Sequence, residues 1–312
     1  MRAIVLKGPG GVEQLQSVEL PQPISRPDEV LVRVNAISIN PVDAKTRAGK
    51  GVYGRIKSED PIILGWDVSG VVVESNAGQF AKGDEVFGMV RFPGHGKAYA
   101  EYVAAPAADL AAKPAGITHT NAAASCLACL TAWQALTEHV RIKPGQRVLI
   151  HAAAGGVGHF AVQLAKHFGA YVIGTASAAN RDFVLDLGAD EHVDYKAQAL
   201  EDAVADVDVV LDTIGGDNID KSLPVIRKGG TIISIPSGMS ESVTDKAKAM
   251  GINGFFFLVR SSGEDMGKIA TLLENGAIQP HVSQVFPFAD MGQAHLQIES
   301  GRTRGKLALR LP

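Results

Sequence analysis

The chain has 312 residues, of which 46% are hydrophobic and 20% are charged, enough apolar side chains for one large or two medium globular domains. Its net charge of −3 lacks the basic excess that favours nucleic-acid binding, and its apolar runs are shorter than the about 20 residues that span a membrane. The apolar stretch at the N-terminus is too short for a signal peptide, so we expect a cytoplasmic protein.

The first 115 residues predict a β-rich module. Apolar and polar residues alternate over 29–36, which is typical of a half-buried strand. Asn40 and Pro41 predict the start of a short helix, because Asn caps helices and Pro fits the first helical position. Residues 62–74 are apolar with two glycines and predict a strand pair in a curved sheet.

The pattern changes near residue 117. An Ala-rich stretch from Thr120 to about Leu136 predicts one long helix. Strands and helices then alternate, which favours a parallel, doubly wound sheet. Residues 305–311 predict a last strand that returns to the N-terminal module, since a lone strand needs a sheet to join. The strands of the alternating region are predicted at residues 147–150, 170–175, 191–195, 207–212 and 230–235.

A small-residue turn follows the first of these strands and precedes a helix. Ala153, Gly155 and Gly158 occupy the three positions of the G-x-G-x-x-G fingerprint. A glycine in such a turn is expected to adopt backbone angles that other residues avoid. The helix N-terminus behind it offers free N–H groups to a pyrophosphate. A connection without a ligand is the alternative when the motif is considered alone.

The second strand of the sheet indicates which dinucleotide binds. NAD sites place an acidic residue after this strand, about 20 residues beyond the glycines. Here Ser177, Asn180 and Arg181 follow instead, and the first acid, Asp182, is expected on the helix. A carboxylate would repel a 2′-phosphate, so the sequence favours NADPH over NADH. The alternative for Arg181 is an ordinary exposed helix residue.

The cysteines, Cys126 and Cys129, are spaced C-x-x-C without a second pair to complete a four-sulfur metal site. Their apolar flanks predict two reduced cysteines that act as small core residues.

Several motifs together resemble the zinc-free, quinone oxidoreductase branch of the medium-chain dehydrogenase/reductase superfamily. The resemblance implies an α/β protein with a GroES-like catalytic domain, residues 1–120 completed by 275–312, and a Rossmann domain, residues 121–274. It also places the active site in a cleft between them. The motifs are Asn40-Pro41-Val42-Asp43, residues 65–72, Thr131-Ala132, residues 152–158, residues 187–190, residues 212–216 and Gly305-Lys306.

The differences from the zinc enzymes of that superfamily imply that no metal is bound. Those enzymes carry Cys at the position of Asn40 and Gly-His-Glu where this chain has Gly65-Trp66-Asp67. A catalytic zinc needs about three protein ligands, and two of the usual ones are missing. Asp43, Asp67 and His95 could in principle bind a metal, but Asp43 is interpreted as a helix cap or turn residue and His95 as a loop residue in solvent.

Without zinc, the chemistry that remains is hydride transfer to an electron-poor acceptor, a quinone or an α,β-unsaturated ketone or aldehyde. Asn40 is expected to orient the carbonyl or the nicotinamide ribose, and Tyr53 and Trp66 to line a flat pocket, with Tyr53 a proton source. For both aromatic residues core packing is the alternative. A non-catalytic NADPH-binding redox sensor or structural protein is the alternative function, and a metal-dependent dehydrogenase with unusual ligands is a third.

Thr131 is expected beside the nicotinamide ring, and the resemblance places Tyr195 near the adenosine phosphate and Lys306 near cofactor or substrate. It also implies a homodimer formed through an edge strand near residues 255–259. The full predicted cofactor site comprises Thr131, Ala154, Gly155, Gly156, Val157, Gly158, Ser177, Asn180, Arg181, Tyr195, Ile214 and Lys306.

Overall fold

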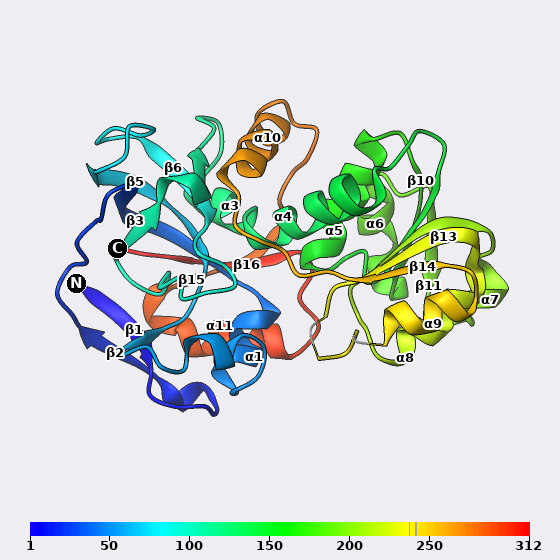
Figure 1. Ribbon diagram of the computed structural model, residues 1–312, viewed down its shortest axis with the longest axis horizontal. Helices are drawn as coiled ribbons and strands as arrows, with labels where there is room; N and C mark the ends of the chain where they lie inside the picture. The colour runs from blue at the N-terminus through cyan, green and yellow to red at the C-terminus, as the bar shows by residue number, and fades with distance from the viewer. Residues whose placement is uncertain (237, 241) are drawn as a thin grey trace. The chain divides into compact units, whose positions relative to one another are not determined.

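The computed structural model describes residues 1–236, 238–240 and 242–312. The chain forms two compact units (Figure 1). Unit 1 comprises Met1–Leu130 and Val259–Pro312, so both ends of the chain belong to it, and unit 2 comprises Thr131–Leu258. Within the described residues, no helix is both long enough and apolar enough to cross a membrane.

Unit 1 is built on two sheets. A three-stranded sheet has the order β2-β1-β4, and a seven-stranded sheet has the order β15-β16-β3-β5-β6-β8, with β7 also paired to β3. The strands are β1 (Arg2–Leu6), β2 (Leu15–Glu19), β3 (Glu29–Ile39), β4 (Ile62–Ile63), β5 (Asp67–Ser75), β6 (Glu85–Met89), β7 (Tyr102–Pro106), β8 (Leu110–Ala112), β15 (Val282–Pro287) and β16 (Lys306–Arg310). The helices are α1 (Pro41–Arg47), α2 (Tyr53–Ile56), α3 (His119–Ala124), α10 (Gly263–Glu274) and α11 (Met291–Glu299), with short 3₁₀ turns η1 (Val12–Gln14), η2 (Ala107–Asp109) and η6 (Phe288–Asp290).

The predicted return of the last strand is confirmed. β16 runs antiparallel to β3, with Leu307 opposite Ile39, and parallel to β15. Two strands form over 62–74, β4 and β5, but the prediction that they pair is wrong, because β4 pairs with β1 and β5 pairs with β3 and β6 in the other sheet. A Cβ at Gly70 would lie 2.1 Å from the carbonyl oxygen of Arg33 on β3. Glycine therefore lets β5 lie close to β3 at this point.

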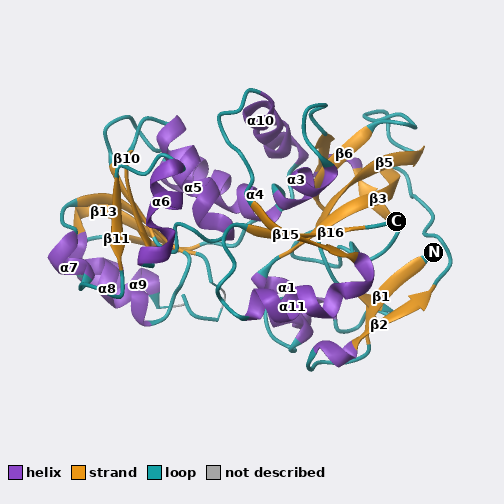
Figure 2. Cartoon of the chain, turned by 180° about the vertical axis from the view of Figure 1, so that it is seen from behind, coloured by secondary structure: helices purple, strands orange, loops and turns teal. Residues whose placement is uncertain are grey.

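Unit 2 contains one parallel sheet of six strands in the order β11-β10-β9-β12-β13-β14, so the predicted doubly wound sheet is confirmed. This is the strand order of dinucleotide-binding folds, in which the direction of winding reverses between β9 and β12. Helices α5 and α6 lie on one side of the sheet and α7, α8 and α9 on the other (Figure 2). The strands are β9 (Arg147–Ile150), β10 (Tyr171–Ala176), β11 (Glu191–Asp194), β12 (Val207–Asp212), β13 (Ile226–Ser234) and β14 (Asn253–Phe256). The helices are α5 (Gly156–His167), α6 (Arg181–Asp186), α7 (Leu200–Ala203), α8 (Asp217–Ser222) and α9 (Val243–Ala249), with 3₁₀ turns η4 (Ala178–Asn180) and η5 (Leu223–Val225).

The single helix predicted from Thr120 to Leu136 is wrong. The segment forms α3, then α4 (Leu127–Gln134), then a π-helical turn, η3 (Ala135–Val140). The break falls at Ser125 and Cys126, and the N–H of Leu127 donates to the buried Asp67 carboxylate at 2.9 Å. A partner from another element therefore begins a new helix at a point that local propensity does not mark.

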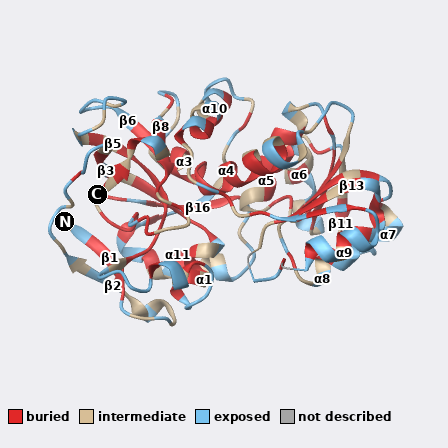
Figure 3. Cartoon of the chain, viewed as in Figure 1, coloured by how far each residue is buried: buried red, intermediate tan, exposed pale blue. Residues whose placement is uncertain are grey.

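The units also divide at different residues from the predicted domains, after 130 and 258 rather than after 120 and 274. Helix α10 accounts for the second difference, because it packs on β8, β6 and η2 of unit 1. The strands of both units are largely buried, while the outer faces of the helices are exposed (Figure 3).

Candidate functional site

The predicted phosphate-binding turn in unit 2 connects β9 to α5, and α5 begins at Gly156 with Gly155 as its N-cap. The left-handed residue of this turn is Ala152, with φ +47°, whereas Gly155 has φ −83°. The expectation that a glycine supplies the unusual backbone angle is therefore wrong. Gly158 is needed for close packing instead, because a Cβ there would lie 2.2 Å from the Ala152 carbonyl oxygen.

Neighbouring strand ends hold this turn in place. The N–H of Ala153 donates to the Thr175 carbonyl at 2.9 Å, and that of Ala152 to the Thr175 hydroxyl at 3.3 Å. The buried His151 bonds through Nδ1 to Thr175 at 3.1 Å and through Nε2 to the Ser222 hydroxyl at 2.9 Å. Burial lowers the pKa of His151 to about 4, and the nearby Asp212 opposes that shift. The left-handed Ala152 is thus held by β10 and α8 together.

This turn fits a dinucleotide pyrophosphate. The first N–H groups of a helix have no intrahelical partner, and the first turn of α5 contains no acidic residue that would repel an anion. The missing side chains of Gly155 and Gly156 leave the backbone open to close approach. Ala154, Gly155, Gly156, Val157 and Gly158, all predicted as cofactor-binding residues, form this turn and the start of α5.

The end of β10 carries the residues predicted to read the ribose. Ser177 is the N-cap of the 3₁₀ turn η4, and Asn180 Nδ2 donates to the Ser177 hydroxyl at 3.3 Å. Arg181 starts α6 with 61% of its side chain exposed, and its partner, Asp182 at 3.3 Å, is 88% exposed. Tyr195 directly follows β11 and is 60% exposed. All four residues therefore lie beyond the carboxyl ends of β10 and β11.

The loop after β12 is organised by Asp212. Its carboxylate accepts the N–H groups of Ile214 at 3.0 Å and Gly215 at 3.1 Å, and the Ser234 hydroxyl donates to it at 2.6 Å. Gly215 has φ +75°, so this tight loop requires glycine. The loop presents Ile214, a predicted cofactor contact, with 43% of its surface exposed.

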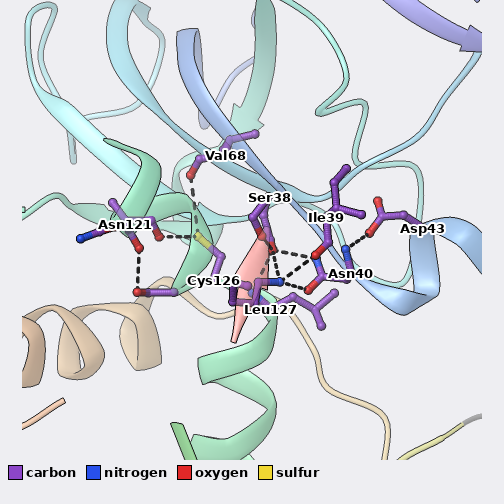
Figure 4. A network of polar contacts seen from close by, with 12 residues as sticks. Ser38, Ile39, Asn40, Asp43, Val68, Asn121, Cys126 and Leu127 are labelled. Atoms are coloured by element: carbon purple, nitrogen blue, oxygen red, sulfur yellow. Dashed lines mark hydrogen bonds and ion pairs between the residues drawn. The ribbon is translucent and has the colours of Figure 1, made fainter. Parts of the chain in front are cut away.

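Unit 1 holds a buried polar network around Asn40 (Figure 4). Asn40 Nδ2 donates to Asp67 Oδ2 at 2.8 Å, and the Lys306 ammonium donates to Asn40 Oδ1 and, at 3.0 Å, to the Ile39 carbonyl. Lys306 Nζ lies 3.9 Å from Asp67 Oδ2. The Ser38 hydroxyl donates to the same carboxylate oxygen at 2.6 Å. The network fixes which way the Asn40 amide faces.

The charges of this network are desolvated. Burial raises the pKa of Asp67, and Lys306, Asn40, Ser38 and Leu127 oppose that shift. Burial lowers the pKa of Lys306, opposed by Asp67 and Asp43. Such a pair persists only when hydrogen bonds satisfy both partners, which is the arrangement found here.

Helix α1 confirms the predicted cap. Asn40 is the N-cap and Pro41 the first helical residue. Asp43, the third residue, accepts the Asn40 N–H at 2.8 Å and closes a capping box.

Trp66 does not line a pocket. Its side chain is fully buried, its Nε1 donates to the Gly94 carbonyl at 2.7 Å, and its ring packs edge-on against Phe92 at 5.3 Å. We therefore assign Trp66 to the core of unit 1. Tyr53 begins α2 and packs partly buried against that core, and Thr131 is buried in α4.

His95 is also placed differently from the prediction. It is buried rather than in solvent, accepts the Ile63 N–H on Nε2 at 3.0 Å and lies 3.1 Å from Glu59. Cys126 and Cys129 are both free and buried, and burial raises the pKa of each thiol. Among the described residues, no group of three or more His, Cys, Asp or Glu side chains is placed to hold a metal ion.

Sequence reasoning missed several residues that organise the site. The sequence marks Asp67 as a replaced position and, in principle, as a metal ligand, and it does not single out Ser38, His151 or Thr175. Asp67 carried a usable signal, since a carboxylate inside a long apolar stretch, residues 62–73, requires a buried partner. The partner, Lys306, lies on a strand more than 200 residues away in the sequence, and only the fold brings them together.

Substitution of Gly158 by Ala is expected to lower the free energy of unfolding by about 1–3 kcal/mol, the usual cost of overpacking. The added methyl would meet backbone rather than a movable side chain. The turn should shift and dinucleotide affinity should fall with it. Urea unfolding and cofactor titration measure the two effects.

Gly267→Ala is the matched control, since nothing lies within 4 Å of its Cβ position in α10. It should leave stability unchanged or raise it by about 0.5–1 kcal/mol. Equal effects of the two substitutions would contradict close packing at Gly158.

Two family models match the chain. Residues 26–115 match the alcohol dehydrogenase GroES-like domain, and residues 187–309 match zinc-binding dehydrogenase. An Arabidopsis thaliana relative described as a chloroplastic NADPH-dependent alkenal/one oxidoreductase is 35% identical over 99% of this chain and 79% of its own length.

Solved structures agree with these matches. The quinone oxidoreductase of Coxiella burnetii has a TM-score of 0.95 at 36% identity, covering 100% of this chain and 99% of that one. That of Escherichia coli, complexed with NADPH, has a TM-score of 0.90 at 30% identity, covering 99% of this chain and 100% of that one. The chain therefore belongs to the quinone-oxidoreductase-like branch of the medium-chain dehydrogenase/reductase superfamily.

Proposed function

We propose that this protein is an NADPH-dependent, metal-independent reductase that transfers a hydride to a quinone or to an α,β-unsaturated ketone or aldehyde. The observation that carries the proposal is the charged network in which Lys306 and Asp67 hold the Asn40 amide. The activities for which the alkenal/one oxidoreductase and quinone oxidoreductase relatives are named support the substrate class.

The network supports a metal-independent reaction. The ammonium of Lys306 lies against Asn40, the residue that stands where zinc enzymes of the superfamily carry a cysteine ligand. A divalent cation beside Asn40 would face this buried positive charge at low local dielectric, which is strongly unfavourable. Because Lys306 already neutralises Asp67, the carboxylate requires no metal ion as a counter-charge.

The exposed end of β10 supports NADPH. The side chain of Arg181 is 61% exposed, and that of its partner, Asp182, is 88% exposed. Such exposed ion pairs are weak, so Arg181 is available to a 2′-phosphate. Ser177 and Asn180 add hydrogen-bond donors on the same turn, and Tyr195 lies beyond the next strand.

The bound nicotinamide supplies the hydride, and the protein supplies orientation and charge stabilisation. Asn40 Nδ2 carries a second hydrogen, and the described residues provide no acceptor for it. We assign this N–H to a carbonyl oxygen of the acceptor or to the nicotinamide ribose. The donor would steady the negative charge that develops on the acceptor oxygen. Tyr53 remains the proposed proton source, and Thr131 and Lys306 remain proposed cofactor neighbours.

A panel of quinones and enones, assayed with NADPH and NADH in the presence and absence of a chelator, tests the proposal. NADPH oxidation should depend on the acceptor and be unaffected by chelation. Tight NADPH binding without turnover of any acceptor would instead support a non-catalytic redox sensor. Loss of turnover on chelation, restored by zinc, would support a metal-dependent enzyme.

The substitution Arg181→Ala should raise the KM for NADPH about tenfold and leave the KM for NADH unchanged, because a charge-assisted hydrogen bond to the 2′-phosphate is lost. Steady-state kinetics with both cofactors measure the change. Lys228→Ala, an exposed cation elsewhere in unit 2, should alter neither value. Equal changes in the KM values for NADPH and NADH would show that Arg181 does not recognise the 2′-phosphate.

A homodimer formed through β14 and a cytoplasmic location complete the proposal. β14 is the edge strand of its sheet, and Phe255 and Phe256 are each 41% exposed on it. An exposed apolar edge strand favours pairing with a second chain. Light scattering of the purified protein measures the oligomeric state.

A further inference from the structure

A chain of buried hydrogen bonds in unit 1 leads from helix α11 to Asp43. Arg47 Nη1 lies 3.2 Å from His295 Nδ1, His295 Nε2 lies 2.9 Å from the Tyr99 hydroxyl, and that hydroxyl donates to Asp43 Oδ1 at 2.9 Å. Tyr99, His295 and Asp43 have no exposed surface. The second oxygen of Asp43 accepts the backbone N–H of Asn40 at 2.8 Å. The series of hydrogen bonds therefore ends at Asn40, the residue at the centre of the candidate site.

The hydrogen bonds of this series all donate in one direction, from Arg47 towards Asp43, and Arg47 sets that direction. A guanidinium can only donate, so His295 Nδ1 must accept and Nε2 must carry the hydrogen. Tyr99 then accepts from His295 and has its single hydrogen for Asp43. Burial and the adjacent Arg47 lower the pKa of His295 to about 3, so the imidazole remains neutral and keeps this tautomer. Arg47 is itself held by Glu299 at 2.7 Å and by the Gly10 carbonyl at 3.0 Å.

Protonation of Asp43 conflicts with this direction at both oxygens. A proton on Oδ1 would face the Tyr99 hydroxyl, which could turn only if His295 changed tautomer and presented an N–H to Arg47. A proton on Oδ2 would face the Asn40 N–H. Either position breaks a hydrogen bond inside the core, and the second one opens the cap that holds Asn40 at the start of α1.

The burial of Asp43 and the charges around it bring this carboxylate close to taking up a proton. Burial and Asp67, on β5, raise the pKa of Asp43 to about 7, opposed by the Asn40 N–H, by Tyr99 and by Lys306 on β16. The groups that face it are thus Asp67, Lys306 and Tyr99, with His295 and Arg47 behind the tyrosine. Two buried carboxylates share one buried ammonium.

We propose that Arg47, His295 and Tyr99 are positioning residues that hold Asp43 in its ionised form, and that ionised Asp43 fixes the backbone of Asn40 for catalysis. The inference rests on the proposed function, since it assigns Asn40 a place in the reaction. It predicts that kcat/KM falls on the acid side as Asp43 takes up a proton and the Asn40 cap opens.

Tyr99→Phe tests the inference with little change in shape. Loss of the donor should move the acid limb of kcat/KM to higher pH by about one unit, while activity on the plateau above the limb stays within about threefold of wild type. His295→Leu should move the limb in the same way, and His295→Gln, which can still donate to Tyr99, should keep it near the wild-type position. Asp43→Asn should remove the acid limb and have low activity at every pH.

Tyr102→Phe is the matched control, because it removes a tyrosine hydroxyl that belongs to the same unit but not to this series of hydrogen bonds. Its acid limb should coincide with that of the wild type. A Tyr99→Phe enzyme that loses activity equally at all pH values, with an unmoved limb, would show a packing role only and would overturn the proposal.

A measurement without turnover separates this inference from the proposed function. In the free protein, the carboxyl ¹³C shift of Asp43 and the amide ¹⁵N shift of Asn40 should titrate with one shared midpoint, which rises in Tyr99→Phe. Independent titration of the two signals would overturn the positioning role. Failure of the wild type to reduce any acceptor would contradict the proposed function, while the shared NMR midpoint would still stand for the hydrogen-bond chain.

Discussion

Substitution of Lys306 by Met is expected to lower the free energy of unfolding by about 3–5 kcal/mol, the usual cost of removing one partner of a buried ion pair. Asp67 would be left with no exposed surface and no cation in contact, and Asn40 Oδ1 would lose its donor. Acceptor-dependent NADPH oxidation should fall with it. Urea unfolding and the steady-state assay measure the two losses.

Two further variants test whether the stability lost in Lys306→Met comes from the broken ion pair. Lys306→Arg retains the positive charge and should retain most of the stability. The double variant Lys306→Met, Asp67→Asn removes both charges and should recover part of the stability lost in the single variant, without recovering activity. A Lys306→Met protein as stable as the wild type would show that the pair contributes nothing to folding.

Substitution of His151 by Gln is expected to change how stability depends on pH. The folded-state pKa of about 4 lies below the ordinary value of 6.5, so between these values the unfolded chain binds a proton that the folded protein does not. Stability due to the neutral imidazole is therefore complete above pH 6.5 and is lost as the pH falls towards 4. The difference between these two pKa values corresponds to about 3 kcal/mol.

The difference in free energy of unfolding between wild type and His151→Gln should thus shrink by about 3 kcal/mol from pH 7 to pH 4. Other titrating groups, including Asp43 with its opposite shift, cancel in this difference. Urea unfolding at a series of pH values measures it. A difference for His151→Gln that is constant with pH would contradict a buried neutral histidine.

The fold was predictable because its signals are local. Strands such as Arg147–Ile150 and Val207–Asp212 are apolar runs with clear limits, and the structure confirms both. The break between α3 and α4 was not predictable, since it coincides with a contact between Leu127 and Asp67, 60 residues apart. Helix α10 was assigned to the wrong region because its packing partners, not its own residues, decide which unit it joins.

The candidate site, like the fold, has features that local sequence predicts and features that depend on distant elements. The turn at 152–158 and the Asn40 cap follow from residues adjacent in the sequence, and both were predicted. The residue that adopts the left-handed conformation was assigned wrongly, because Thr175 and Ser222 hold this region from other elements and Ala152 takes the angle. Trp66 was misassigned for a related reason, since an aromatic side chain looks the same in the sequence whether it lines a pocket or fills a core.

The position of β16 has a consequence for how the protein is made. β16 is an internal strand of the seven-stranded sheet, between β15 and β3. During synthesis all of unit 2 leaves the ribosome before residue 306 is translated, so the Rossmann unit can fold on the nascent chain. Until β16 is made, residues 36–39 of β3 have no strand paired along this edge, and Asp67 lacks its cation. The strand that completes the sheet is also the one that brings Lys306, so the network around Asn40 can form only after all of unit 2 has been synthesised.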